Sequence, residues 1–317
     1  MKIFVYNLRD FDEKKWFDKY CGQFGIEYEG TPDYPTEDNV DLAAGAEVIS
    51  IIPCPMGKDL LERFASVGVR HIAARSIGLD HIDLAAAEML GIKVTNAHYS
   101  PSSVANYAIL MMLSSCRRYT QILRRAALQV FTLRGSMGRE FSDCTVGIIG
   151  SGSIGKTVIR HLQGFGCRIL VWNRSRDEQA AAMAEYVPLE MLLAESDIIS
   201  LHLPGKPELF HFLGEEEFRL MKNGVILVNT ARGSLIDEDA LIANLQSGKV
   251  GYAALDTIEE ETGLYYHDFQ GKTLPGKKLN ILRSLPNVDI TPHMAFYTEK
   301  AVAEQIECVV RAAGELG

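Results

Sequence analysis

An arginine, a histidine and a run of glutamates follow predicted strands and form a set suited to acid–base chemistry on an anion. Arg232 comes after the apolar stretch Gly224–Thr230, and His293 comes after Val288–Thr291. Arginine can grip a carboxylate with two parallel hydrogen bonds, and histidine changes charge nearest neutral pH. A carboxylate beside the histidine would favour its protonated form and orient it. Such a set suits hydride reduction of a 2-oxo acid, in which a carbonyl stands next to a carboxylate.

Three consecutive residues are candidates for that carboxylate: Glu259, Glu260 and Glu261, just past the predicted strand Val250–Asp256. Spacing alone does not choose among them. Each residue of the set also has a purely structural interpretation, as a surface arginine, a structural histidine or a solvated acidic run. We expect chemistry because ligands of open α/β sheets bind outside the carboxyl ends of the strands.

A glycine-rich turn stands at the centre of the chain, between the predicted strand Thr145–Ile149 and a predicted helix that runs to Leu162. A second predicted strand, Cys167–Trp172, completes a dinucleotide-binding βαβ unit. Its first glycine permits the tight turn, the second lets the backbone approach a pyrophosphate, and the third lets the helix pack closely. We expect five residues to hold the cofactor phosphates at the helix N-terminus: Gly150, Gly152, Ser153, Ile154 and Gly155.

The residues after the second strand predict which dinucleotide binds. NAD sites usually carry an acid about 20 residues past the first glycine, whereas this chain has Asn173, followed by Arg174, Ser175 and Arg176. A neutral residue does not repel a 2′-phosphate, and two arginines can pair with one. The sequence therefore favours NADP(H), with NAD(H) as the other possibility. The alternative for the two arginines is a solvated basic loop.

Strands and helices alternate along the chain, which predicts parallel sheets covered by helices on both faces. We expect Ser100 to cap a long helix that starts at Pro101, runs to about Tyr119 and crosses between domains. The helix Val302–Ala313 should return to the first domain. The other predicted elements before this crossing are Lys2–Asn7, Phe11–Phe24, Glu47–Ile52, Met56–Ser66, His71–Ala74, Ile82–Leu90 and Ile92–Thr95.

Length and composition narrow the class of protein. The chain has 317 residues, enough for two domains with separate cores. A net charge of −9 argues against a nucleic acid or an anionic membrane as general partner. No apolar run approaches the roughly 18 residues of a membrane span, and the chain starts in a strand rather than a signal peptide, so we expect a cytoplasmic protein. The cysteines are scattered without metal-like spacing, which predicts reduced thiols and no metal site.

Taken together, these motifs resemble the D-2-hydroxyacid dehydrogenase family, and specifically its D-lactate dehydrogenase-like branch, over nearly the whole chain. Besides the glycine turn, the resemblance rests on Arg75–Asp80, Tyr99–Pro101 with Val104–Ala105, Asn229–Gly233, Ala254–Thr257 and Thr291–His293. It implies an α/β fold of two doubly wound parallel-sheet domains. A Rossmann nucleotide-binding domain, residues 99–296, would be inserted in a flavodoxin-like substrate domain made of residues 1–98 and 297–317.

The resemblance also implies roles for single residues. The catalytic set would be Arg232, Glu261 and His293. The resemblance thus identifies one of the three glutamates, which spacing alone does not. Backbone N–H groups of Ile77 and Gly78 would hold the substrate carboxylate, and Tyr99 and Phe296 would wall its side-chain pocket. Four residues would line the cofactor: His202, Pro204, Thr230 and Asp256. Asn173 departs from the aspartate of the family's NAD enzymes.

The lactate branch of the family suggests a substrate and an oligomeric state. The 32-residue gap from Glu261 to His293 and the segment Met294–Glu299 resemble the lactate branch. We expect reduction of pyruvate to the (R)-2-hydroxy acid, or else of a branched or aromatic 2-oxo acid, since the loop Thr262–Ser284 leaves the pocket size open. A dinucleotide-binding, corepressor-like protein is the alternative from another class. The family is usually homodimeric through the nucleotide-binding domain, and we expect a homodimer.

Overall fold

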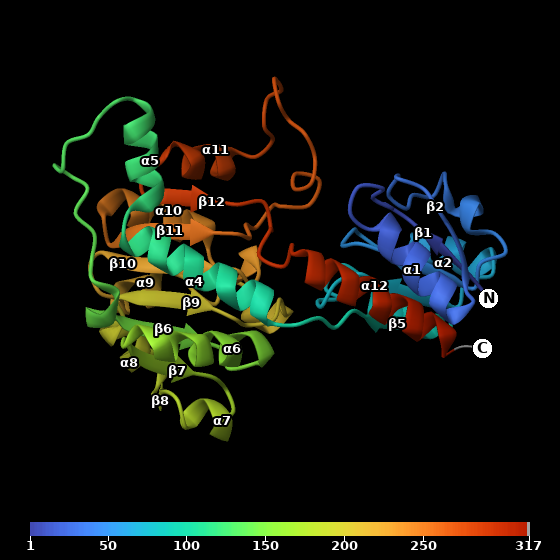
Figure 1. The fold of residues 1–317 in the computed structure, drawn as a ribbon, viewed down its shortest axis with the longest axis horizontal. Coiled ribbons are helices and arrows are strands. Elements are labelled where there is room, and N and C mark those ends of the chain that lie inside the picture. Colours follow the sequence, from blue (N-terminus) through green and yellow to red (C-terminus); the bar gives the residue numbers. More distant parts are fainter. Residues whose placement is uncertain (316–317) are drawn as a thin grey trace. The chain divides into compact units, whose positions relative to one another are not determined.

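The computed structural model describes residues 1–315, and within them the chain forms two compact units (Figure 1). The first unit contains Met1–Ser100 and the chain from Tyr297 onward, and the second contains Pro101–Phe296. The sequence-based boundary after residue 98 lies two residues before this division. Because the chain enters and leaves the second unit once, that unit is an insertion in the first.

In the described residues of the first unit, five parallel strands form one sheet in the order β2-β1-β3-β4-β5. This 2-1-3-4-5 order is that of flavodoxin-like folds, as expected. The strands are β1 (Lys2–Val5), β2 (Glu27–Gly30), β3 (Val48–Ile51), β4 (His71–Ala74) and β5 (Lys93–Asn96). The sequence does not predict β2, because this edge strand has largely exposed residues and no apolar run to indicate it.

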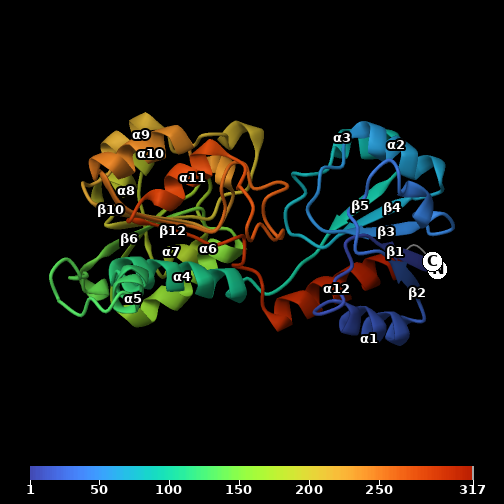
Figure 2. The ribbon, with the colours of Figure 1, turned by 90° about the horizontal axis from the view of Figure 1, so that it is seen from above.

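Helices cover both faces of this sheet (Figure 2). One face packs on α1 (Lys14–Phe24) and α12 (Glu299–Gly314), so the last helix belongs to the first unit. The other face packs on the 3₁₀ helix η1 (Val40–Ala43), α2 (Lys58–Ser66) and α3 (Leu84–Met89). Along β1 the buried side chains alternate between the two cores, since successive strand residues point to opposite faces.

In the second unit, seven parallel strands of the described chain form a sheet in the order β12-β11-β10-β9-β6-β7-β8. From β8 to β12 this is the 3-2-1-4-5-6 order of dinucleotide-binding sheets with a further strand at the end, and the order reverses between β6 and β9. The strands are β6 (Thr145–Ile149), β7 (Arg168–Trp172), β8 (Glu185–Tyr186), β9 (Ile198–Leu201), β10 (Val225–Asn229), β11 (Val250–Leu255) and β12 (Val288–Ile290).

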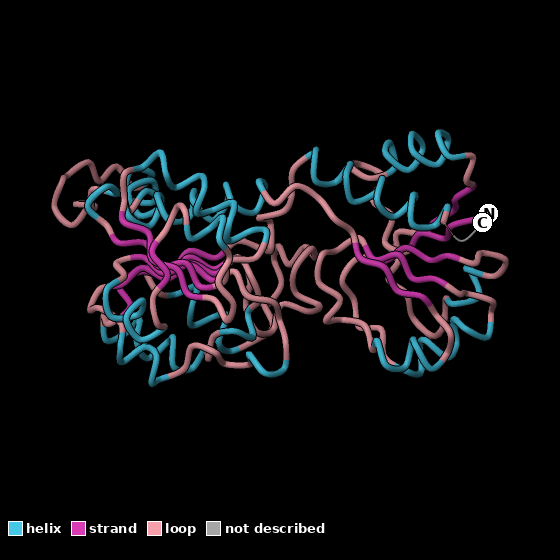
Figure 3. The backbone as a smooth tube through the Cα atoms, turned by 90° about the horizontal axis from the view of Figure 1, so that it is seen from below, coloured by secondary structure: helices cyan, strands magenta, loops and turns pink. Residues whose placement is uncertain are grey.

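Helices cover both faces of this sheet, and Figure 3 shows the strands lying between them. One core joins the sheet to α4 (Ser102–Cys116), α6 (Ser153–Leu162) and α7 (Glu178–Ala181). The opposite core joins it to α8 (Leu189–Glu195), α9 (Glu215–Leu220), α10 (Glu238–Ser247) and α11 (Lys277–Ser284). Short 3₁₀ helices are η2 (Phe141–Asp143), η3 (Gln163–Phe165), η4 (Pro207–Leu209) and η5 (Gly233–Leu235).

The expected start and end of the long helix were wrong by one to three residues. Pro101 is the N-cap of α4 and makes no side-chain cap bond, whereas the backbone N–H of Ser100 donates to the carboxylate of Glu304 at 2.7 Å. The helix ends at Cys116 because Arg118 adopts a left-handed φ of 53°. A separate helix that the sequence did not indicate, α5 (Tyr119–Ala127), follows. No helix in residues 1–315 is long and apolar enough to cross a membrane.

Candidate active site

One edge of the seven-stranded sheet gathers the polar residues that the sequence singled out. All its strands are parallel, so their carboxyl ends lie along the same edge. Each of six strands is followed there by a predicted site residue: Gly150 after β6, Asn173 after β7, His202 after β9, Arg232 after β10, Asp256 after β11 and His293 after β12. The sheet therefore brings together positions up to 143 residues apart in the chain.

His293 pairs with Glu261. A carboxylate oxygen of Glu261 lies 2.9 Å from Nδ1 of the imidazole, and both side chains are about three-quarters buried. The second oxygen of Glu261 is buried with no hydrogen-bond partner in the described chain. The ring of Phe296 lies edge-on to the imidazole, with the centroids 6.4 Å apart. Because Glu261 takes Nδ1, the other ring nitrogen, Nε2, is the atom that can exchange a proton with a ligand.

A buried aspartate shapes the turn that carries this histidine. His293 has a left-handed φ of 53°, and its N–H donates to the carbonyl of Asp256 at 2.8 Å. The carboxylate of Asp256 accepts from the Thr291 hydroxyl at 2.6 Å and from the N–H groups of Met294 and Ala295 at 2.8 and 2.9 Å. Burial raises the pKa of Asp256 despite these bonds. The sequence predicts Asp256 among the residues that line the cofactor, and in the structure its fully buried carboxylate holds the turn of His293.

Arg232 stands at the next strand end, on a turn fixed by Asn229. The fully buried Asn229 amide donates to the carbonyl of Arg232 at 2.8 Å and accepts from the N–H of Ala231 at 2.9 Å. The half-buried guanidinium donates to the Ala231 carbonyl at 2.8 Å. The stem of Arg232 packs on Gly205, where an added Cβ would lie 2.8 Å from Cγ. The Arg232 side chain therefore has a defined position beside the loop after β9.

The glycine turn is tightly packed at two positions and open at the third. Gly150 has φ of 102°, and a Cβ there would lie 2.6 Å from the carbonyl oxygen of His202. A Cβ on Gly155 would lie 2.0 Å from the carbonyl oxygen of Gly150. Around Gly152, the N-cap of α6, an added Cβ meets nothing within 4 Å. Ser153 and Ile154 begin the helix, so their N–H groups are among those left without a partner in the helix.

Beyond β7 the loop is polar and exposed. The Asn173 amide donates to the carbonyl of Ser175 at 2.8 Å. Arg174 is exposed, and the guanidinium of Arg176 lies 5.3 Å from the centre of the Tyr186 ring. Arg176 also forms an exposed ion pair with Glu178 at 3.4 Å. The arginines therefore lie at the end of β7, where the sequence placed them.

The remaining predicted cofactor residues follow β9 and β10. The ring of His202 makes a 3.0 Å hydrogen bond with the hydroxyl of Ser200, and burial lowers its pKa to about 4. Pro204 is exposed in the loop that follows. The hydroxyl of Thr230 is buried and has no partner in the part of the chain that is described.

Two backbone N–H groups of the first unit face no protein acceptor. The carbonyls of Ser76, Ile77 and Gly78 accept, respectively, from the Ala97 N–H at 2.9 Å, the Asn96 amide at 2.8 Å and the Ser76 hydroxyl at 2.7 Å. Within residues 1–315, the N–H groups of Ile77 and Gly78 donate to none. Two adjacent N–H groups of this kind can hold an anion. Tyr99, the other substrate residue expected in this unit, is half-buried.

A buried arginine anchors the start of that loop. Arg75 forms an ion pair with Glu13 at 3.0 Å, both side chains being almost completely buried. Its guanidinium also donates to the Ser50 hydroxyl at 3.0 Å and to the carbonyls of Tyr6 and Asn7 at 2.9 and 3.0 Å. A buried charge with this many partners holds its backbone firmly, because breaking one contact would leave a charge unpaired.

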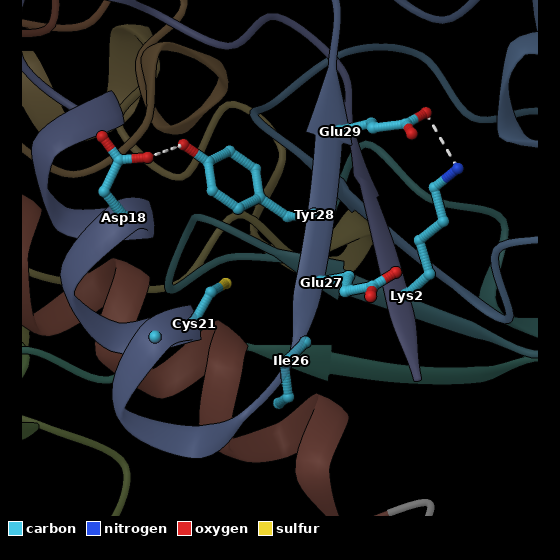
Figure 4. A pocket seen from close by; sticks show the side chains of 8 residues that line it. Lys2, Asp18, Cys21, Ile26, Glu27, Tyr28 and Glu29 are labelled. Atoms are coloured by element: carbon cyan, nitrogen blue, oxygen red, sulfur yellow. Dashed lines mark hydrogen bonds and ion pairs between the residues drawn. The ribbon is translucent and has the colours of Figure 1, made fainter.

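A hollow of about 400 Å³ lies elsewhere in the first unit, between α1 and β2. Figure 4 shows the Tyr28 hydroxyl directed at the carboxylate of Asp18, to which it donates, and Lys2 directed at Glu29, with which it forms a 2.8 Å ion pair. These groups satisfy one another, and no predicted site residue lines the hollow. No cluster of side chains in residues 1–315 could hold a metal ion.

Comparisons with known proteins find similar sequences and similar structures. A family model described as D-isomer specific 2-hydroxyacid dehydrogenase, NAD binding domain, matches residues 109–295. A D-specific alpha-keto acid dehydrogenase of Enterococcus faecalis is 42% identical over 280 residues, covering 88% of this chain and 85% of that protein. An aromatic 2-oxoacid reductase of Clostridium sporogenes is 37% identical over 312 residues, with 97% and 93% covered.

A D-lactate dehydrogenase of Lactiplantibacillus plantarum is 36% identical over 310 residues, covering 96% of this chain and 93% of that protein. Among solved structures, the pyruvate reductase of Chlamydomonas reinhardtii matches with a TM-score of 0.90 and 30% identity, covering 100% of this chain and 96% of that one. The similarity therefore extends over both units.

Proposed function

The chain belongs to the D-isomer specific 2-hydroxyacid dehydrogenase family, and from this premise we propose that it reduces a 2-oxo acid to the D-2-hydroxy acid. The observation that carries the proposal is the 2.9 Å pair of Glu261 and His293, on the sheet edge that also carries Arg232. Glu261 orients the imidazole and stabilises its charged form. His293 gives a proton to the carbonyl oxygen through Nε2. Arg232 binds the substrate's oxygens and stabilises the negative charge that develops.

The residues around the glycine turn suit a nicotinamide dinucleotide, which supplies the hydride when bound. The space in front of Gly152 and the start of α6 suit a pyrophosphate, since helix N-termini favour anions. The buried hydroxyl of Thr230 has no partner among the described residues, so it has a hydrogen bond to offer a ligand. His202 and Pro204 complete the proposed lining.

The loop after β7 supports NADP(H) as the preferred cofactor. Asn173 carries no charge to repel a 2′-phosphate, and the exposed Arg174 and Arg176 can pair with one. The following acid, Asp177, forms a 2.7 Å ion pair with Lys156, which offsets its charge. NAD(H) is the alternative cofactor, with the arginines as solvated surface residues.

For the substrate we propose pyruvate first. The family resemblance assigns the N–H groups of Ile77 and Gly78 to its carboxylate, and Tyr99 and Phe296 to the wall beside its side chain. A branched or aromatic 2-oxo acid is the second candidate, which the similarity to an aromatic 2-oxoacid reductase supports. One methylene changes discrimination by only about 1–3 kcal/mol, so small differences in that wall decide the preferred acid.

We also propose a homodimer formed through the second unit. Its helix α5 contains no buried residue, and apolar side chains are exposed on it and on the segment that follows. These side chains are Tyr119, Ile122, Leu123, Leu128, Val130, Phe131, Leu133 and Met137. A soluble monomer rarely exposes so many large apolar side chains close together in the chain, whereas a second copy would cover them.

Steady-state assay of the purified protein tests the function. We expect NADPH oxidation, followed by absorbance, with pyruvate or a bulkier 2-oxo acid from a panel, and the D isomer as product. Binding of the dinucleotide without turnover of any acid would favour the corepressor-like alternative. Formation of the L isomer would contradict the proposed reaction, and sedimentation of the same sample tests the dimer.

A further inference from the structure

We propose that Glu259 is a positioning residue of this reaction: it clamps the segment 258–261 so that Glu261 stays against His293. The inference rests on the proposed function, in which the Glu261–His293 pair handles the proton. Glu259 does not contact His293 itself. Its contacts join three separate elements.

Both carboxylate oxygens and the backbone N–H of Glu259 are engaged. One oxygen lies 2.5 Å from Nε2 of His211, in the loop after η4. The other accepts from Nζ of Lys278, at the start of α11, at 3.2 Å. The N–H donates to a carboxylate oxygen of Glu238, the first residue of α10, at 2.7 Å. A single residue is therefore held at three points.

The two carboxylates of the clamp are more shielded from water than its histidine and lysine, which are 30% and 28% exposed. The side chain of Glu259 is 14% exposed, and Glu238 is 4% exposed. Burial raises the pKa of Glu238. Hydrogen bonds to Asp239 and Glu259 raise the pKa of Lys278, so the ammonium stays charged at neutral pH. Charges that are partly buried and paired in this way resist separation, because a lone charge would remain.

His211 is itself fixed in an unusual conformation. It has a left-handed φ of 53°, its N–H donates to the carbonyl of Ser234 at 2.8 Å, and its ring stacks on that of Phe210 with centroids 3.9 Å apart. Its Nδ1 faces Asp237 at 3.8 Å. Non-glycine residues persist in this region only where the surroundings hold them, often at functional sites.

The clamped segment also abuts the turn that carries Arg232. An added Cβ on Gly233 would lie 1.9 Å from the carbonyl carbon of Ile258, so the two backbones are in direct contact. On the other side, the carbonyl of Glu261 accepts from the N–H groups of Leu264 and Tyr265, both at 3.0 Å. Glu261 and Arg232 are thus carried by segments that touch each other.

The three consecutive glutamates therefore differ in what they contact. Glu259 faces His211, Lys278 and Glu238, whereas Glu261 faces His293. Glu260 is exposed and borders a hollow of about 260 Å³ beside α11. Glu260 is a matched control, because it has the same charge in the same segment without the contacts of the clamp.

The test compares Glu259→Gln with Glu260→Gln. A misplacement of about 1 Å can cost on the order of 10²-fold in rate, and we expect Glu259→Gln to lower kcat about tenfold. Its upper pH limit for reduction should move to lower pH, in the direction of Glu261→Gln, while the affinity for NADPH stays unchanged. A Lys278→Met variant, which keeps the His211 contact, should show the same changes to a smaller extent. Glu260→Gln should match the parent.

A double-variant cycle separates this proposal from the proposed function. If Glu259 acts through Glu261, Glu259→Gln should have no further effect on kcat or the pH limit in a Glu261→Gln background. A shift of the pH limit in Glu261→Gln with none in Glu259→Gln would overturn the clamp alone. An unchanged limit in Glu261→Gln would instead overturn the proposed pair. A loss of activity in Glu259→Gln that matches a loss of folded protein, with no change in pH limit, would also overturn the clamp.

Discussion

Nδ1 of His293 lies 2.9 Å from a carboxylate oxygen of Glu261, which precedes it by 32 residues in the chain. The contact assigns different tasks to the two ring nitrogens: one faces the carboxylate and the other is left for proton exchange. It also separates Glu261 from Glu259, which pairs with His211 instead.

Replacing His293 should remove the proton donor. Asparagine tolerates the left-handed backbone that His293 adopts, so His293→Asn should fold normally. We expect kcat to fall by about 10²–10⁴-fold, the usual contribution of general acid–base catalysis. Affinity for NADPH, measured by fluorescence titration, is the control and should stay unchanged. Near-normal turnover would exclude His293 as the acid.

Removing the charge of Glu261 should change how turnover depends on pH. Reduction requires the protonated histidine, and the carboxylate stabilises that form. Glu261→Gln lacks that carboxylate, so we expect the upper pH limit for reduction to move down. The limit for oxidation of the hydroxy acid should move in the same direction. The measurement is a profile of kcat/KM against pH for the parent, Glu261→Gln and Glu260→Gln. A shift in Glu260→Gln without one in Glu261→Gln would identify Glu260 as the partner of the histidine.

The loop after β7 should set the cofactor preference. Charge-assisted hydrogen bonds contribute roughly 1.5–3 kcal/mol each, less at exposed positions such as Arg174. Since 1.4 kcal/mol corresponds to a factor of ten, we expect NADPH to be favoured by about 10- to 100-fold. Asn173→Asp with Arg174→Ala should reverse the preference, because an acid accepts from the ribose 2′-OH and repels a phosphate. The measurement is kcat/KM for both cofactors. A parent enzyme that prefers NADH would refute the argument.

A methyl group at Gly155 should disrupt the cofactor turn. Its Cβ would lie 2.0 Å from the carbonyl oxygen of Gly150, and backbone cannot move aside as a flexible side chain can. Overpacking typically costs about 1–3 kcal/mol, so Gly155→Ala should lower the thermal midpoint and weaken NADPH binding. Gly164→Ala is the control, since nothing lies within 4 Å of the added carbon. Equal behaviour of the two variants would contradict the packing.

Acid should weaken the first unit through His71. This histidine is fully buried in β4, and burial lowers its pKa to about 4. As the pH falls below about 6.5, this histidine takes up a proton in the unfolded chain but not in the folded one. The free energy of unfolding therefore decreases as the pH falls from about 6.5 to about 4, by up to about 1.4 kcal/mol per pH unit. His71→Gln should flatten that part of a plot of thermal midpoint against pH. The exposed His98→Gln should leave it unchanged, and a parental slope in His71→Gln would count against the effect.

The repeating local pattern of the chain was enough to predict most of the fold. Apolar β-branched runs separated by helical stretches indicate parallel strands in both units, and the glycine turn after β6 indicates a βαβ unit. These signals are local, because each strand of a parallel sheet is buried on both faces and so must be apolar itself. The edge strand β2 has one neighbour and exposed side chains, so its segment Glu27–Gly30 carries no such signal.

Spacing and local pattern do not choose among the like residues: the family resemblance implies Glu261, and the contact of Glu261 with His293 exists only in the tertiary structure. Glu259, Glu260 and Glu261 have the same side chain and adjacent positions, so no local pattern distinguishes them. Which of them meets His293 depends on where α10, α11 and the loop after η4 hold the segment, and these elements are brought to it only by the folded sheet. The chemistry was present in the residue types, whereas the pairing required contacts between residues far apart in the chain.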